Sequence, residues 1–300
     1  MMMYEKFKEK MKNVIEEYFE DVQAIEDTRI KVNSKSEHLI LKKGSVCPSI
    51  NLETEYEVYK EMQDDEAYIK RILNIIKKSF EDAKKFEFDF DSETVTDKIT
   101  FQLINAEKNR ELLERVPHKK FLDLAIIYRI LLSCDDEETT SAVINKEMQQ
   151  KLGLTDENLF TMAASNTLKT NPPQFFDMYN PFEMKSFDDI RDIDLEEREN
   201  DIPTFVLTNK AKVYGAGSML YVENLHKLAK VLDSDLIILP SSIHEVIALP
   251  ENKTNINELR YRVRSINDTE RNESEILSYR LYRYSRETKR ITIVEGENDR

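Results

Sequence analysis

The sequence predicts an α+β fold, with mixed or antiparallel sheets and helices packed on one face. Several segments place apolar residues at three- and four-residue steps, the spacing of one helical face, while others are short apolar runs typical of strands. The predicted strands fall in adjacent pairs rather than in regular alternation with helices. This order favours antiparallel pairing over a parallel βαβ sheet.

The first 80 residues predict three helices and one hairpin. Apolar side chains recur at helical spacing over residues 4–22, so the chain is expected to open with an amphipathic helix. Short apolar runs at 30–32 and 39–41 flank a polar stretch and predict two strands of a hairpin. The helical period returns over 52–80 and breaks at 64–66, which predicts two further helices.

The middle of the chain predicts helices around a buried strand. Apolar residues over 99–116 suggest a helical piece that ends before Pro117, because the residue preceding a proline disfavours the α conformation. The apolar run 121–132 is interpreted as a strand buried on both faces, with a helix as the alternative. Residues 141–144 would pair with this strand, and Thr155 would cap a following helix.

Residues 171–202 are expected to form an acidic, proline-containing linker between two subdomains, 1–170 and 203–300. Nine acidic residues and only three basic ones lie within 181–201, and the segment has little apolar periodicity. We therefore expect limited proteolysis to cut first in this segment.

The last 100 residues predict a β-β-α-β-β unit followed by helices. The expected elements are a hairpin of 204–209 with 213–221, a helix over 222–232, a strand pair of 236–239 with 246–249, helices over 256–266 and 274–283, and a strand over 290–294.

Composition limits the classes of function. The chain has 44 Lys and Arg against 58 Asp and Glu, a net charge of −14, so binding to a nucleic-acid backbone is unfavourable overall. Cys47 and Cys134 have no close-spaced companion, which fits a reducing compartment. The first residues lack the apolar core of a signal peptide, and the longest apolar runs are too short to cross a bilayer. We expect a cytoplasmic protein that is not integral to a membrane, with its oligomeric state open.

The segment Ser241, Ser242, Ile243, His244, Glu245 is the candidate functional loop. It lies between two predicted strands, where a loop can present polar side chains. In an extended segment Ser242 and His244 share one face, which would allow a hydroxyl and an imidazole to meet. The alternative is a turn in which the serines and Glu245 bind backbone groups. No catalytic residue is assigned.

Other motifs in the chain are incomplete. A zinc-protease motif at His244 and Glu245 would need a second histidine where the chain has Ala248. Gly215 and Gly217 begin a dinucleotide-binding pattern whose third glycine would fall at Leu220, so a bulge or a tight strand contact is the better interpretation. Neither a metal nor a cofactor is therefore expected.

Residues 260–290 carry nine basic and five acidic side chains, interleaved with tyrosines. Arginine and tyrosine suit recognition of proteins or RNA, through ion pairs and stacking. The candidate partner-binding residues are Arg260, Tyr261, Arg264, Tyr282 and Arg283. Docking of this segment onto the chain's own acidic surface is the alternative.

Five stretches carry a resemblance to a known family: 97–113, 116–128, 162–167, 207–210 and, most specifically, ILPSSIHEVIALP at 238–250. They resemble an uncharacterised bacterial family of Firmicutes, the domain-of-unknown-function family 5688, over nearly the whole chain. The resemblance implies a bacterial, cytoplasmic setting and a shared architecture, but no reaction.

The leading hypothesis is a non-enzymatic binding or regulatory protein that engages a protein partner. One alternative is a small hydrolase or transferase centred on the SSIHE segment, and another is an RNA-contacting module that uses the C-terminal arginines and tyrosines. Whether the protein is an enzyme stays open at this point.

Overall fold

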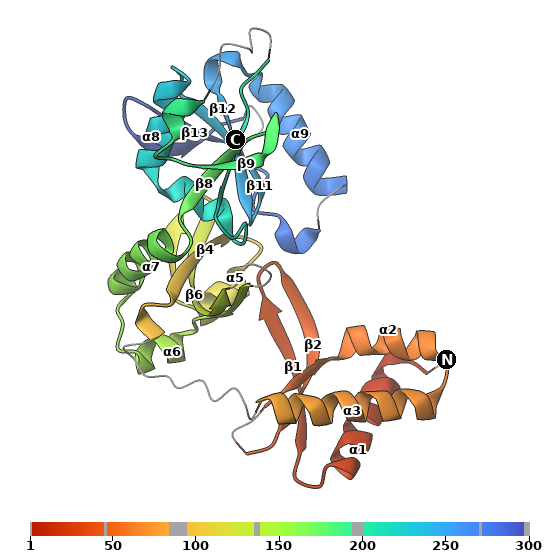
Figure 1. The fold of residues 1–300 in the computed structure, drawn as a ribbon. Coiled ribbons are helices and arrows are strands. Elements are labelled where there is room, and N and C mark those ends of the chain that lie inside the picture. The colour runs from red at the N-terminus through yellow and green to blue at the C-terminus, as the bar shows by residue number, and fades with distance from the viewer. Residues whose placement is uncertain are drawn as a thin grey trace. The chain divides into compact units, whose positions relative to one another are not determined.

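The computed structural model describes residues 2–44, 47–83, 95–134, 139–193, 201–269 and 272–296. The chain divides into two compact units, Met1–Phe90 and Asp91–Arg300. Figure 1 shows the first unit in red to orange and the second in yellow to blue. The boundary differs from the expected one at 171–202, because residues 173–186 of that segment form two strands of a sheet in the second unit. The three sheets in the described part of the chain are antiparallel, which is consistent with the α+β fold expected.

The first unit packs three helices with a small sheet. Its elements are α1 (Tyr4–Tyr18), β1 (Gln23–Lys31), β2 (Ser34–Lys42), β3 (Ser49–Asn51), α2 (Leu52–Met62) and α3 (Asp65–Ala83), and the sheet order is β1-β2-β3. Phe7 and Ile15 of α1 pack in one core with Leu39 of β2 and Ile72 of α3. The opening helix and the helix break near residue 64 are confirmed, and so is the hairpin, although its strands are longer than expected and residues 34–38, expected to connect them, belong to β2.

A four-stranded sheet begins the second unit. Its elements are β4 (Ile99–Asn105), α5 (Arg110–Arg115), β5 (His118–Phe121), β6 (Leu124–Cys134), β7 (Thr139–Val143), α6 (Lys146–Lys151) and α7 (Asp156–Thr170). Strand β6 pairs with β4, β5 and β7. The buried strand at 121–132 and its partner are thus confirmed, as is Thr155, which accepts a hydrogen bond from the Asn158 backbone N–H and caps α7.

The helix expected from residue 99 onward is wrong for its first part. Residues 99–104 are all buried, and they pair with β6 from Ile99 opposite Ile130 to Asn105 opposite Leu124. The apolar spacing fits a helix as well as a strand, and the buried polar residues Thr100 and Gln102 obscure the strand. The helical part is the short α5.

A seven-stranded sheet completes the second unit, in the order β14-β13-β11-β12-β10-β8-β9. Its strands are β8 (Pro173–Asp177), β9 (Asn180–Ser186), β10 (Phe205–Asn209), β11 (Leu236–Ser242), β12 (Glu245–Pro250), β13 (Tyr282–Ser285) and β14 (Arg290–Ile293). The pair β11–β12 and the strand at 290–293 match the expectation.

Two elements of the C-terminal prediction differ from the structure. Residues 213–221 do not pair with β10, because Gly215–Leu220 forms the 3₁₀ helix η2, which packs against that strand. Residues 274–283 are not a helix: they contain a short 3₁₀ turn and the start of β13, where buried Tyr282 and Tyr284 alternate with exposed Arg283. This two-residue period is that of a strand.

Helices cover both faces of the seven-stranded sheet, rather than the one face expected. Helix α9 (Ile256–Thr269) packs Leu259 onto Ile237 of β11. The adjacent Leu236 is opposite Tyr284, whose hydroxyl contacts His226 of α8 (Val222–Val231). Successive strand residues point to opposite faces. Helices α8 and α9 therefore lie on the two sides of the sheet (Figure 1). Within the described ranges, none of the helices has the length and apolar character needed to cross a membrane.

Candidate functional site

The SSIHE segment is the tight turn of the β11–β12 hairpin. Ser242 and Glu245 form the last pair of the ladder, so Ile243 and His244 are the two turn residues. The Ser242 hydroxyl, which is buried, accepts a 3.0 Å hydrogen bond from the His244 backbone N–H. Ser241 donates its hydroxyl to Glu245 Oε1 at 3.1 Å. The serines and Glu245 thus stabilise the turn itself.

The turn is attached to neighbouring segments through His244. Its Nδ1 accepts a 3.2 Å hydrogen bond from the Tyr214 backbone N–H, and its carbonyl oxygen accepts one from Thr208 Oγ1 at 2.9 Å. The imidazole also stacks on the Tyr214 ring, with centroids 5.6 Å apart and planes 15° from parallel. Because Nδ1 accepts, a neutral His244 carries its proton on Nε2.

The Tyr214 ring also packs against a buried arginine of the four-stranded sheet. Arg129 of β6 is only 9% exposed, and its guanidinium carbon lies 4.6 Å from the Tyr214 ring centroid. Its Nε and Nη2 donate to the hydroxyl and carbonyl oxygens of Ser141, at 2.9 and 3.1 Å, and its Nη1 donates to Gln102 Oε1 at 3.0 Å. We name Gln102, Arg129, Ser141, Tyr214 and His244 the Arg129 cluster.

Burial dominates the electrostatics of this cluster. It lowers the pKa of Arg129, because a charged guanidinium loses hydration in the interior, and Tyr214 opposes the shift. Sequence reasoning missed Gln102, Arg129, Ser141 and Tyr214. The sequence feature that could have revealed the cluster is Arg129 itself, because a charged residue is rare in an apolar run interpreted as a strand buried on both faces.

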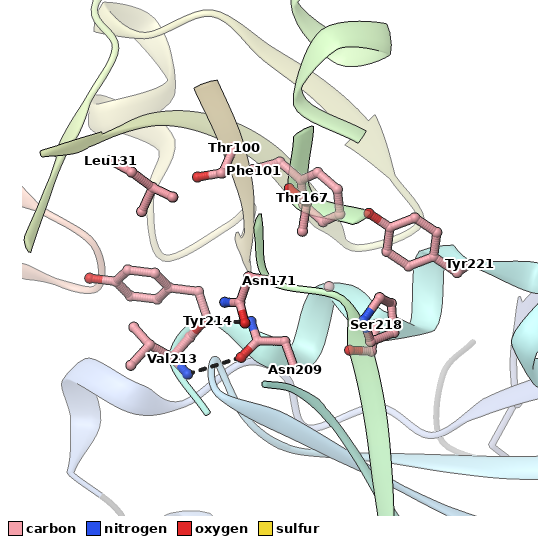
Figure 2. Close-up of a pocket in the computed structure, with 12 residues that line it drawn as sticks. Thr100, Phe101, Leu131, Thr167, Asn171, Asn209, Val213, Tyr214, Ser218 and Tyr221 are labelled. Carbon is pink, nitrogen blue, oxygen red and sulfur yellow. Dashed lines mark hydrogen bonds between the residues drawn. The ribbon is translucent and has the colours of Figure 1, made fainter. Parts of the chain in front are cut away.

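A small pocket of about 30 Å³ borders the cluster (Figure 2). Tyr214 is the member of the cluster that lines it, and Asn171, Asn209 and Ser218 contribute further polar groups. A space of this size holds one or two water-sized groups rather than a metabolite. The pocket therefore gives no support for a large substrate.

The glycines of η2 allow its close packing in this region. A Cβ at Gly217 would lie 2.4 Å from the Phe101 ring, and one at Gly215 would lie 2.2 Å from Thr208 Oγ1. Neither position has room for a side chain. The glycine pair is thus explained by tight contact of η2 with its neighbours, as the incomplete nucleotide-binding pattern suggested.

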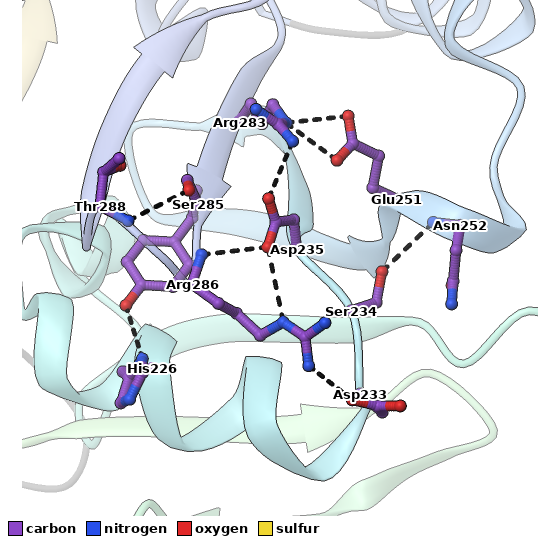
Figure 3. Close-up of polar contacts among 11 residues, drawn as sticks. His226, Asp233, Ser234, Asp235, Glu251, Asn252, Arg283, Ser285, Arg286 and Thr288 are labelled. Atoms are coloured by element: carbon purple, nitrogen blue, oxygen red, sulfur yellow. Dashed lines mark hydrogen bonds and ion pairs between the residues drawn. The ribbon is translucent and has the colours of Figure 1, made fainter.

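The predicted partner-binding residues do not form one surface. The Tyr282 side chain is fully buried, and Arg260 donates to the carbonyl oxygen of Val294 at 3.2 Å and to that of Glu295. Arg283 donates to Glu251 and Asp235, both at distances under 3 Å (Figure 3). Tyr261 and Arg264 of α9 are exposed.

The remaining histidines each have a local contact. His226 Nδ1 lies 3.1 Å from the Tyr284 hydroxyl, His118 Nδ1 lies 3.2 Å from the Val116 carbonyl oxygen, and His38 Nε2 lies 2.9 Å from Ser36 Oγ. Across the part of the chain that the structure describes, no three His, Cys, Asp or Glu side chains are grouped so as to hold a metal ion.

A second candidate site is the exposed apolar tip of the β8–β9 hairpin. Phe182 is 96% exposed, and Met178 and Tyr179 are at least half exposed. Ile202 is also exposed. It lies near Met178 along the chain's path, because the Met178 backbone N–H donates to the carbonyl oxygen of Thr204 at 3.0 Å. We name these four side chains the hairpin tip. Sequence reasoning missed them because they fall in the segment interpreted as a linker.

Comparisons with known proteins place the chain in a family. No curated protein and no solved structure matches it. A family of unknown function, DUF5688, matches residues 4–286, which is most of the chain. The chain therefore belongs to the DUF5688 family, in agreement with the resemblance of its sequence.

Proposed function

We propose that this protein is a non-enzymatic binding or regulatory protein that engages a protein partner through the hairpin tip. The observation that carries the proposal is the exposure of Met178, Tyr179 and Phe182 within five residues of one hairpin, with Ile202 exposed two residues before Thr204, whose carbonyl accepts from the Met178 N–H. Large apolar and aromatic side chains that remain exposed together are typical of interaction sites, where such residues serve as anchors.

The hairpin that carries these side chains is held in place by pairing with the seven-stranded sheet. Strand β8 pairs with β10 over five residues, from Pro173 opposite Asn209 to Asp177 opposite Phe205. Phe175 packs in the core beside Phe205, with ring centroids 6.0 Å apart. A partner would therefore meet anchors whose backbone is already ordered, which lowers the entropic cost of binding.

The charge of the same stretch of sequence suggests the chemistry of the partner. Residues 181–201 carry nine acidic and three basic side chains. An apolar groove with a basic rim would complement both features, and its association would be accelerated by electrostatic attraction at low salt. A cytoplasmic, bacterial setting, which the family resemblance implies, belongs to the same proposal.

The contacts of the other candidate sites favour this proposal over the two alternatives. In the SSIHE turn, the Ser242 hydroxyl and His244 Nδ1 both accept backbone N–H groups, which is a role in holding the turn. In the arginine-rich segment, Arg260 and Arg283 are bonded to other parts of the chain, so fewer cations remain for RNA phosphates.

Affinity capture with the full chain tests the proposal. Wild type, Phe182→Ser and Tyr261→Ser would be compared for the proteins they retain from an extract of the source cells, by quantitative mass spectrometry. Tyr261 is the matched control, because it is an exposed aromatic residue on α9. We expect a partner that wild type and Tyr261→Ser retain and that Phe182→Ser loses. The purified partner should then bind Phe182→Ser at least about tenfold more weakly.

Two results would contradict the hairpin tip as the binding surface. Retention of the same proteins by wild type and Phe182→Ser would remove it from consideration. Loss of a partner from Tyr261→Ser alone would move the binding surface to α9. Thermal unfolding serves as the folding control, since a change at so exposed a side chain should leave the melting temperature nearly unchanged.

A further inference from the structure

We propose that the Arg129 cluster is a binding site for a small anion. Arg129 is a buried cation: it is 9% exposed and lies in the centre of the four-stranded sheet. Among the described residues, no carboxylate forms an ion pair with it, and its three hydrogen bonds go to uncharged oxygens of Ser141 and Gln102. Buried charges in proteins are normally paired, so within the described part of the chain this one lacks a counter-charge.

A second observation points to the same missing acceptor. Gln102 is fully buried, and its amide nitrogen Nε2 has no hydrogen-bond partner among the residues that the structure describes. The oxygen of the same amide accepts from Arg129, so the unpartnered N–H donors lie beside the guanidinium. The guanidinium itself has more N–H donors than its three hydrogen bonds use. Buried polar groups without partners are rare in native proteins.

The chemistry of the ligand follows from these donors. Donors from an amide and a guanidinium together call for an acceptor that carries negative charge. A water molecule would satisfy N–H groups but would leave the charge of Arg129 uncompensated. Gln102 is fully buried and Arg129 is 9% exposed, so only an anion as small as chloride, nitrate or formate could reach both donors.

The site also has a structural consequence. Arg129 reaches Tyr214 and, through its ring, the His244 imidazole at the tip of the β11–β12 hairpin. An anion on Arg129 would therefore stabilise the contact between the four-stranded sheet and the turn that carries the SSIHE segment. Because a ligand that binds the native state raises stability by mass action, unfolding is a direct readout of occupancy.

The test is thermal unfolding of the full chain with increasing sodium chloride, nitrate or formate. Sodium gluconate at the same ionic strength serves as an anion too large for the site. The wild type is expected to show a saturable rise in melting temperature with the three small anions, of about 3 °C at a tenfold excess over the dissociation constant. Gluconate should produce none of this rise.

Gln102→Glu supplies the missing negative charge from within the protein. This variant should lose the response to chloride and should be at least as stable as wild type without added anion. Gln150→Glu, at an exposed position of α6, adds the same charge elsewhere and should keep the full response. A chloride response that survives in Gln102→Glu would overturn the proposal, as would an equal response of wild type to gluconate.

Chloride-35 nuclear magnetic resonance keeps the test independent of the stability of any variant. Exchange of chloride with a protein site broadens the chloride line, and nitrate or formate should narrow it again by displacement. A wild-type linewidth that does not change on addition of nitrate would mean that the cluster holds water only, and the proposal would fail.

Discussion

The hydroxyl of Tyr282 donates a 2.9 Å hydrogen bond to Oδ1 of Asp123 and links the two sheets of the second unit. Tyr282 lies in β13 of the seven-stranded sheet, and Asp123 lies in the turn that precedes β6 of the four-stranded sheet. Ser278 donates to the other carboxylate oxygen at 2.6 Å. Burial raises the pKa of Tyr282 well above its usual value, so the tyrosine remains a donor at all ordinary pH values.

Removal of this hydrogen bond should destabilise the protein. Tyr282→Phe leaves the Asp123 carboxylate with one donor fewer, and a hydrogen bond to a charged group contributes about 1.5–3 kcal/mol. Chemical denaturation of wild type, Tyr282→Phe, Asp123→Ala, which removes the acceptor, and the double variant would measure the effect. A coupling energy of about 1 kcal/mol or more between the two changes is expected.

Tyr284→Phe is the matched control for that cycle. It also removes a buried tyrosine hydroxyl, but one that contacts His226 and not Asp123. Its effect should simply add to that of Asp123→Ala. If Tyr282→Phe is also additive with Asp123→Ala, then the hydrogen bond does not stabilise the contact between the two sheets.

The SSIHE turn yields a second prediction. His244→Ala removes the acceptor for the Tyr214 backbone N–H and the stacked ring, so the free energy of unfolding should fall by about 1 kcal/mol. His244→Asn, whose side-chain oxygen can accept in place of Nδ1, should restore part of the loss. A melting temperature of His244→Ala equal to that of wild type would remove the structural role and revive a functional one.

Much of the fold could be predicted from the spacing of apolar residues. Long amphipathic helices such as 65–83 and strand pairs such as 236–249 follow from it. Strand β4 could not be predicted, because the buried Thr100 and Gln102 interrupt its apolar pattern. Thr100 and Gln102 are buried because they pair and pack with distant parts of the chain. Local sequence propensity contains no information on such long-range contacts.

The candidate site was less predictable than the fold. The sequence located the SSIHE turn, but its partners Thr208 and Tyr214 come from a segment expected to be a hairpin. Tyr282 and Arg283 were grouped by composition, although neighbouring residues of a strand face opposite ways: one is in the core and the other is paired at the surface. The buried cluster was not predicted, and the sequence feature that points to it is the position of Arg129 within an apolar run.

A third prediction concerns the pH dependence of the first unit. His38 is buried, and burial lowers its pKa below the usual value, with Arg29 and Lys31 acting in the same direction. In the unfolded chain the histidine takes up a proton near pH 6.5, whereas in the folded chain it resists protonation to a lower pH. The unfolded state therefore binds more protons in this window, and stability falls as pH decreases from about 6.5 toward the folded pKa.

His38→Gln should remove this part of the acid sensitivity. The glutamine has no proton to gain, so the loss of stability of the first unit between pH 7.5 and pH 5 should be smaller in the variant than in wild type. Urea denaturation at several pH values, followed by the nuclear magnetic resonance signals of backbone amides in the first unit, would measure the difference. His118→Gln, at an exposed histidine of the second unit, is the control and should follow wild type. Parallel stability curves for wild type and His38→Gln across this range would show that burial of His38 does not couple folding to protonation.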